Sequence, residues 1–190
     1  NEYKLHLADA NRRLLRFDDA ASVYREALEN NPDSLPALKA LGEYCANSQR
    51  FEEAAGLIRR QVELVSDDAE AARLWETLGD LYSLRLADPE GAGEAYEKAA
   101  QLAAGQSGPQ WKLWRVLRAQ GEQERLVELG GSLLETPLEG ERLVEVHKVM
   151  GRALAAGGDK EEALVHFEQV LKQPEVELEI VEQTAELYRG

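Results

Sequence analysis

The feature that most limits how this chain can fold is a pattern of small and large residues that recurs along it. Its most complete copy is WETLGDLY, in which Trp75, Leu78, Gly79 and Tyr82 fall on one helical face at spacings of three, one and three. A glycine inside such a run costs about 1 kcal/mol against alanine. The small size of Gly79 must therefore serve either the packing or the function of the protein.

A second helix is expected directly after this run. Asp88 is a favourable N-cap residue, and Pro89 suits the first helical position. On this helix Ala92, Tyr96 and Ala99 share one face at i, i+4 and i+7. The same two-part arrangement recurs twice upstream, in the sets Ala8, Ala20 and Tyr24, and Gly42, Ala54 and Ile58, which are displaced from each other by 34 residues. It recurs once more downstream, in the set Gly151, Ala163 and Phe167.

These runs resemble the tetratricopeptide repeat, a helix–turn–helix unit of about 34 residues with a W-x2-L-G-x2-Y run, then a small residue, an aromatic residue and a closing proline. The resemblance covers essentially the whole chain as five units, at residues 1–34, 35–68, 72–106, 108–141 and 144–176. The third unit carries one extra residue in its turn, around Ala87–Asp88. The resemblance implies an all-α fold, a right-handed α-solenoid of helix-turn-helix repeats that forms a single domain over residues 1–190.

The fourth unit departs most from the pattern. Arg115 replaces the small residue of its first helix, and Gly130-Gly131 stand where an aromatic residue would normally pack. Trp111 and Trp114 could refill the space left by Gly131, or the array could bend or loosen at this point. We expect the tryptophans to compensate, because two of them together are rare in so short a stretch.

One more helix is expected after the fifth unit, over residues 177–189. Its apolar face consists of Ile180, Val181, Thr184, Leu187 and Tyr188. The helix could cap the last repeat, as stacked arrays require for solubility, or it could be the first half of a sixth repeat. We favour the cap, although Tyr188 occupies the position where a repeat would place its tyrosine.

Composition excludes several kinds of partner. The net charge is −14 and the pI is near 4.7, which opposes binding to nucleic acid or to anionic lipid. We find neither an apolar run long enough to span a bilayer nor a signal segment at the amino end. The chain begins with Asn1, which indicates an excised or processed piece, so the compartment stays open, with the cytoplasm favoured.

The sequence shows no constellation of residues that would support catalysis. His6, His147 and His166 lack a second ligand at metal spacing, and we expect them at the surface. Cys45, the single cysteine, falls in an interior position and is expected to be a buried hydrophobic residue. The glycine pairs lack the context of a phosphate loop. The sequence therefore predicts no enzyme, no cofactor and no metal.

In the family that the chain resembles, the first helices of the repeats line a concave groove. The positions opposite the packing face predict an acidic line in the amino half, formed by Asp9, Glu43 and Asp80. In the carboxyl half they predict a mainly apolar floor, formed by Leu84, Leu113, Val116 and Val149, with Lys112, Lys148 and Arg152 beside it. The residues predicted to line the groove are Asp9, Glu43, Arg73, Thr77, Asp80, Leu84, Leu113, Val116, Val149 and Arg152.

The function predicted from this surface is a non-enzymatic scaffold or adaptor that binds a protein or peptide segment in the groove. A basic part of the partner would face the acidic line, and an apolar anchor would lie on the floor formed by Leu113, Val116 and Val149. Two local explanations compete, because Glu43 could pair with Lys39 on its own helix and Val149 could be buried beside Val146.

An alternative function is a structural assembly module. In that case the exposed apolar face of the carboxyl-terminal helix pairs with another copy or stacks with further repeats.

Overall fold

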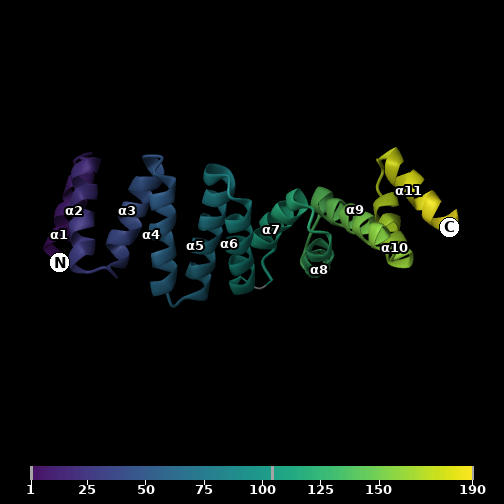
Figure 1. The fold of residues 1–190 in the computed structure, drawn as a ribbon, viewed down its shortest axis with the longest axis horizontal. Coiled ribbons are helices and arrows are strands. Elements are labelled where there is room, and N and C mark those ends of the chain that lie inside the picture. Colours follow the sequence, from purple (N-terminus) through teal and green to yellow (C-terminus); the bar gives the residue numbers. More distant parts are fainter. Residues whose placement is uncertain (1, 104, 190) are drawn as a thin grey trace. The chain divides into compact units, whose positions relative to one another are not determined.

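The computed structural model describes residues 2–103 and 105–189, so Asn1 lies outside the described residues. Throughout these residues every regular element is helical (Figure 1), which confirms the all-α prediction. The elements are α1 (Glu2–Arg13), α2 (Phe17–Asn30), α3 (Leu35–Asn47), α4 (Phe51–Leu64), α5 (Asp68–Leu81), the π-helical turn η1 (Tyr82–Leu86), α6 (Pro89–Leu102), α7 (Ser107–Gln120), α8 (Gln123–Leu134), α9 (Gly140–Gly157), α10 (Lys160–Leu171) and α11 (Leu178–Arg189).

The chain divides into two compact units, residues 1–104 and residues 105–190. In the first unit, α1 pairs with α2, α3 with α4 and α5 with α6, and each later pair packs on the second helix of the pair before it. In the second unit, α7 packs on α8, α8 on α9, α9 on α10 and α10 on α11. Each predicted repeat therefore contains one helix pair, although α5 begins at Asp68, ahead of the predicted start at residue 72. The single domain stays a prediction.

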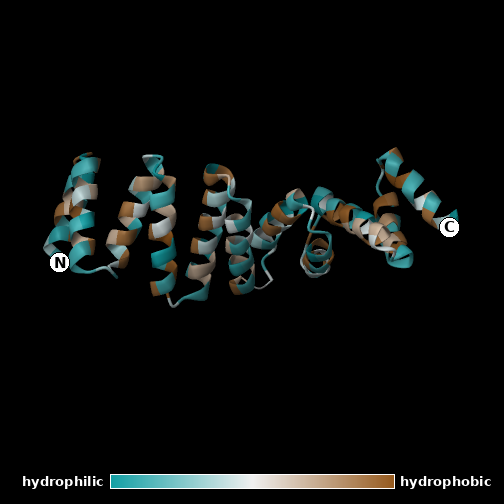
Figure 2. Ribbon diagram, viewed as in Figure 1, coloured by the Kyte–Doolittle hydropathy of each residue, from teal (hydrophilic) through white to brown (hydrophobic). Residues whose placement is uncertain are grey.

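Small residues of the first helices lie directly against large residues of the second helices. A Cβ atom added to Gly79 would lie 2.5 Å from Cε1 of Tyr96, and one added to Gly151 would lie 2.6 Å from Cε1 of Phe167. Neither position can accept a methyl group unless the ring moves. In Figure 2 apolar and hydrophilic residues alternate along the helices, as expected where each helix buries one face. The glycine of WETLGDLY is thus a packing residue.

The turn between the helices of each pair has one repeated design. A residue with positive φ precedes the second helix, and the next backbone N–H closes the end of the first helix. The positive-φ residues are Leu15, Gln49, Ala87, Gly121 and Gly158. In four turns the N–H bonds to the carbonyl five residues back, as from Arg50 to Cys45 at 2.8 Å. In the third turn Asp88 bonds to Tyr82, six residues back, so η1 absorbs the extra residue that the sequence predicted.

In the fourth repeat the structure shifts the predicted register of the second helix by one residue. Gly130 is buried, and a Cβ atom added there would clash with Sδ of Met150 and would lie 3.0 Å from Cζ3 of Trp114. Gly131 is exposed, with nothing within 4 Å of an added Cβ. Trp114 is fully buried. Met150 and Trp114 therefore fill the space beside Gly130, so one of the two predicted tryptophans compensates, and it does so at Gly130 rather than at Gly131.

The last helix, α11, packs one side on the fifth repeat. Ile180 is fully buried in a cluster with Phe167 and Val170, and Leu187 packs against that cluster. The helix thereby shields Phe167, as expected of a terminal helix. Its outward side nevertheless exposes apolar residues, among them Tyr188, whereas a cap would present a polar outer face.

Candidate functional site

The predicted groove residues of the first unit lie mostly at the surface. Glu43, Arg73 and Thr77 are exposed, and Leu84 in η1 is 72% exposed. Arg73, Thr77 and Leu84 share one face of α5 and its π-helical extension, where the Thr77 hydroxyl donates to the Arg73 carbonyl at 2.8 Å. These residues stand apart from the positions that pack α5 against α6.

Two members of the predicted acidic line have a structural role. The Tyr24 hydroxyl donates a hydrogen bond to Oδ1 of Asp9 at 2.6 Å, and the Tyr96 hydroxyl donates to Oδ1 of Asp80 at 2.8 Å. Burial, followed by the hydrogen bond to Asp9, raises the pKa of Tyr24 to about 12. The same two causes raise the pKa of Tyr96, with Asp80 as the acceptor. In both repeats the carboxylate is held by the aromatic residue of the second helix.

Glu43 differs from the two aspartates because its repeat has Ile58 in place of the tyrosine. Its side chain is exposed on α3, and its charge contributes to the raised pKa of Tyr24. Glu43 is thus the acidic residue of this line that lies most openly at the surface of the first unit.

Two residues predicted to form the apolar floor are not at the surface. Leu113 is 5% exposed and Val116 is 9% exposed. On α7 the buried positions are spread widely around the helix, and they are Pro109, Leu113, Trp114, Val116 and Leu117. A helix that buries so broad a face leaves few of its positions to solvent, so the prediction that Leu113 and Val116 face solvent was wrong.

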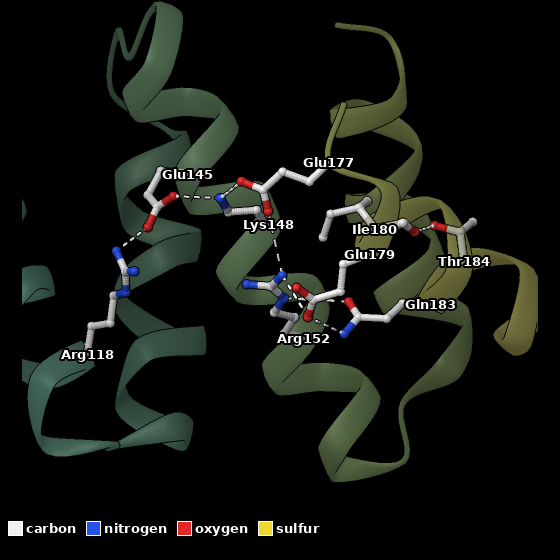
Figure 3. A network of polar contacts seen from close by, with 9 residues as sticks. All are labelled: Arg118, Glu145, Lys148, Arg152, Glu177, Glu179, Ile180, Gln183 and Thr184. Atoms are coloured by element: carbon white, nitrogen blue, oxygen red, sulfur yellow. Dashed lines mark hydrogen bonds and ion pairs between the residues drawn. The ribbon is translucent and has the colours of Figure 1, made fainter. Parts of the chain in front are cut away.

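The remaining carboxyl-half predictions lie on α9. Val149 is partly buried, and the Arg152 guanidinium pairs with Glu179 at 3.0 Å and with Glu177 at 3.8 Å. Lys148 bridges Glu177 at 2.9 Å and Glu145 at 3.3 Å (Figure 3). The hydrogen bond from Lys148 lowers the pKa of Glu177.

Arg118 on α7 pairs with Glu145 and extends this charged network, so it joins three helices of the second unit. The network holds the start of α11 against α9. Lys148 and Arg152, two of the basic residues predicted beside the floor, are therefore engaged within the unit itself.

Sequence reasoning missed a histidine pair. Nδ1 of His147 lies 2.8 Å from Nδ1 of His166, and His166 is buried rather than at the surface as predicted. Burial, and secondly the neighbouring ring, lower the pKa of His147, and burial lowers that of His166. When both rings are neutral, the Nδ1–H of one ring can donate a hydrogen bond to the unprotonated Nδ1 of the other. The sequence did carry a signal that His147 packs toward the second helix, because His147 occupies the position in its repeat that Trp75 occupies in the third repeat.

In the part of the chain that the structure describes, possible metal ligands and nucleophiles do not form a cluster. There, no three side chains of His, Cys, Asp or Glu are placed to hold a metal ion. Cys45 is buried, and burial raises the pKa of its thiol. Over residues 2–103 and 105–189, no helix has the length and apolar character needed to cross a membrane.

Solved structures of other proteins share this fold. The MamA protein is 21% identical over 97% of this chain and 93% of its own, with a TM-score of 0.55. YrrB, described as a TPR protein with an unusual peptide-binding site, is 15% identical over 98% of this chain and 91% of its own, with a TM-score of 0.57. A structure of Naa15/Naa10 bound to HypK-THB is 19% identical, with a TM-score of 0.70, over 96% of this chain but 28% of that one.

Family models give a more specific result. No curated protein sequence matches the chain. Three models of the tetratricopeptide repeat do match it, at residues 5–69, 72–106 and 150–175. These ranges contain the helix pairs of the first unit and most of the α9–α10 pair. The chain belongs to the tetratricopeptide repeat family.

Proposed function

We propose that this protein is a non-enzymatic interaction scaffold that binds a protein or peptide segment on the first-helix face of residues 1–104. That face is defined by Glu43, Arg73, Thr77 and Leu84, together with the tyrosine-bound carboxylates of Asp9 and Asp80. Tetratricopeptide repeats are in general non-catalytic protein-interaction modules. Among the similar structures, YrrB is described as having a peptide-binding site, and Naa15/Naa10 is bound to HypK-THB.

One observation carries the proposal: exposed side chains lie on consecutive first helices at positions that the packing does not use. Glu43 immediately follows the packing residue Gly42, as Asp80 follows Gly79. Glu43 is exposed, whereas Gly42 and Gly79 are buried. A partner can therefore contact the exposed residues of this face, Glu43, Arg73, Thr77 and Leu84, without disturbing the helix pairs.

The chemistry of the face favours a basic partner with an apolar anchor. Glu43 offers an exposed carboxylate. The carboxylates of Asp9 and Asp80 are already oriented by the hydroxyls of Tyr24 and Tyr96, so less side-chain entropy is lost when a partner binds them. Leu84 offers an exposed aliphatic side chain seven residues after Thr77, on the same helical face. The net charge of −14 would speed the approach of a cationic segment and make the association weaker at high salt.

The proposal omits part of the surface predicted from the sequence. Leu113 and Val116 are buried, and Arg152 is paired with two glutamates of the α11 segment. None of these three residues offers an open contact in the second unit. The apolar anchor of the partner is therefore proposed to contact Leu84.

A peptide display selection against the purified chain, followed by fluorescence anisotropy with the selected peptide, tests this proposal. The selection should enrich peptides that carry Lys or Arg near a large apolar residue. Glu43→Lys and Leu84→Asp should each raise Kd by about tenfold or more, as expected when a central contact is lost. Glu94→Lys on α6 and Val165→Asp on α10 are matched controls, because both residues are exposed on second helices. Unchanged Kd values for both face variants would overturn the proposal.

A further inference from the structure

The outward side of α11 is an exposed apolar stripe. Leu178, Val181, Ala185 and Tyr188 follow one another at i, i+3, i+7 and i+10, so they share one face of the helix. Leu178, Val181 and Tyr188 are all exposed, Tyr188 to 63%. This α11 stripe lies apart from Ile180 and Thr184, which face the interior of the second unit, although the hydroxyl of Tyr188, its last residue, donates to Oε1 of Glu168 on α10 at 2.5 Å.

The repeat register indicates what such a stripe is for. Val181 and Ala185 stand 34 residues after His147 and Gly151. On α9 these two positions meet the second helix α10, through the contact of His147 with His166 and the fit of Gly151 against the Phe167 ring. The α11 stripe is thus the surface on which a first helix of this chain receives its second helix.

The opposite end of the chain carries a second exposed apolar stripe. On α1, Tyr3, Leu7 and Ala10 are spaced at i, i+4 and i+7, and Leu14 continues the stripe just beyond the helix. All four are exposed, Tyr3 to 75%. The spacing equals that of the residues with which α10 packs on α9, namely Ala163, Phe167 and Val170.

We infer that α1 of a second copy of this chain docks on α11, with the α1 stripe in the position of a second helix. Leu7 occupies the place in its stripe that Phe167 has on α10, so it would lie against the small residue Ala185. A contact between two different surfaces does not close on itself, so copies would join head to tail in an open series.

Charge favours this occupant over a second α11. The α1 stripe is bordered by the exposed residue Arg13, and the α11 stripe is bordered by the exposed residues Glu182 and Glu186. Docking of α1 on α11 would bring Arg13 toward these carboxylates. Two α11 helices docked on each other would instead bring four carboxylates together, which is unfavourable.

The α1 surface beside its stripe is also hollowed. The hollow has a volume of about 510 Å³ and is lined by His6, Asp9, Ala10, Arg13 and Leu14. It can receive a projecting side chain from the border of α11. The hollow shares Asp9 with the peptide-binding face, but neither Leu7 nor Val181 belongs to that face, so substitutions at these two residues separate the two surfaces.

Sedimentation velocity over a concentration series tests the head-to-tail contact. The wild-type chain should show a mean mass that rises with concentration beyond that of a dimer. Leu7→Asp removes only the α1 surface and Val181→Asp removes only the α11 surface, so each variant alone should stay monomeric. An equimolar mixture of the two should form a dimer and nothing larger, because each pair then keeps one intact contact and two disabled ends.

Several outcomes would overturn the inference. A wild-type chain that stays monomeric at every concentration excludes the contact. Self-association that survives in Leu7→Asp but not in Val181→Asp would assign the contact to α11 alone. A mixture that stays monomeric would show that the two stripes do not meet.

Two controls keep these results interpretable. Circular dichroism should show unchanged helix content in both variants, because the substituted residues are exposed, and Leu14→Asp and Leu178→Asp can replace any variant that misfolds. Affinity for a selected basic peptide should be unchanged in Leu7→Asp, Val181→Asp and Leu178→Asp, so failure of the assembly contact is distinguishable from failure of peptide binding.

Discussion

The Tyr96 hydroxyl on α6 donates a hydrogen bond to Oδ1 of Asp80 on α5 at 2.8 Å, and the Tyr24 hydroxyl on α2 donates one to Oδ1 of Asp9 on α1 at 2.6 Å. Each bond ties the first helix of a repeat to the second. Each also fixes a carboxylate at the face where a partner is proposed to bind. One contact thus links the stability of the repeat to the order of its candidate binding surface.

Loss of this bond should be measurable at neutral pH. Tyr96→Phe keeps the ring against Gly79 but removes the donor, and it should lower the free energy of unfolding by about 1 kcal/mol. Urea denaturation measures this change. Tyr3→Phe is the matched control, because Tyr3 is exposed on α1, and it should change nothing. Equal effects of the two substitutions would contradict a structural role for the bond.

The same tyrosines predict a loss of stability in alkali. The folded pKa of Tyr24 is raised to about 12 from an ordinary value of 10.0, and that of Tyr96 is also raised. The folded state therefore holds these protons more tightly than the unfolded state does. Their contribution is complete below pH 10 and is lost as the pH rises from 10 toward 12. Unfolding curves in this range should be less pH-dependent for a Tyr24→Phe, Tyr96→Phe double variant than for the wild type.

The histidine pair predicts a loss of stability in acid. Burial holds the pKa of both His147 and His166 below the ordinary value of 6.5. Protonation therefore favours the unfolded state, and the contribution present above pH 6.5 is lost as the pH falls below it. A His147→Gln, His166→Gln double variant should lose less stability than the wild type between pH 6.5 and 5. His6→Gln, a change at an exposed position, should behave as the wild type does.

Part of this structure could be predicted from the sequence because its signals are local. The small residues at Gly79 and Gly151, the large residues opposite them and the extra residue in the third turn all follow from spacing along the chain. The structure confirms each of these features, and the extra residue becomes the π-helical turn η1. Periodic burial is the strongest structural signal that a sequence carries.

What could not be predicted depends on contacts between residues far apart in the chain. Whether Val116 lies at the surface depends on how much of the circumference of α7 is buried, and the repeat motif does not specify that fraction. The shift from Gly131 to Gly130 is a change of one residue in register, which the irregular fourth repeat leaves open. The pairing of Arg152 with Glu179 depends on where α11 lies, which spacing within a repeat does not specify.

The register found in the fourth repeat is itself testable. Gly130→Ala should destabilise the chain, because the new methyl group meets Met150 and Trp114, and tight packing of this kind costs about 1–3 kcal/mol. Gly131→Ala should instead stabilise it by up to about 1 kcal/mol, through helix propensity alone. Thermal or urea unfolding compares the two. The opposite order would restore the register predicted from the sequence.

The most direct test of the central claim, that the small residues which pack the helix pairs and the exposed residues which bind the partner are different sets, is a paired measurement of peptide Kd and unfolding free energy on Glu43→Lys and Gly151→Ala. Glu43→Lys should raise Kd by about tenfold or more with unfolding unchanged. Gly151→Ala, whose new methyl group meets the Phe167 ring in the second unit, should lower the unfolding free energy by about 1–3 kcal/mol while the folded variant keeps the wild-type Kd. If Glu43→Lys binds the peptide as the wild type does, or if Gly151→Ala loses binding while it is still folded, the claim is contradicted.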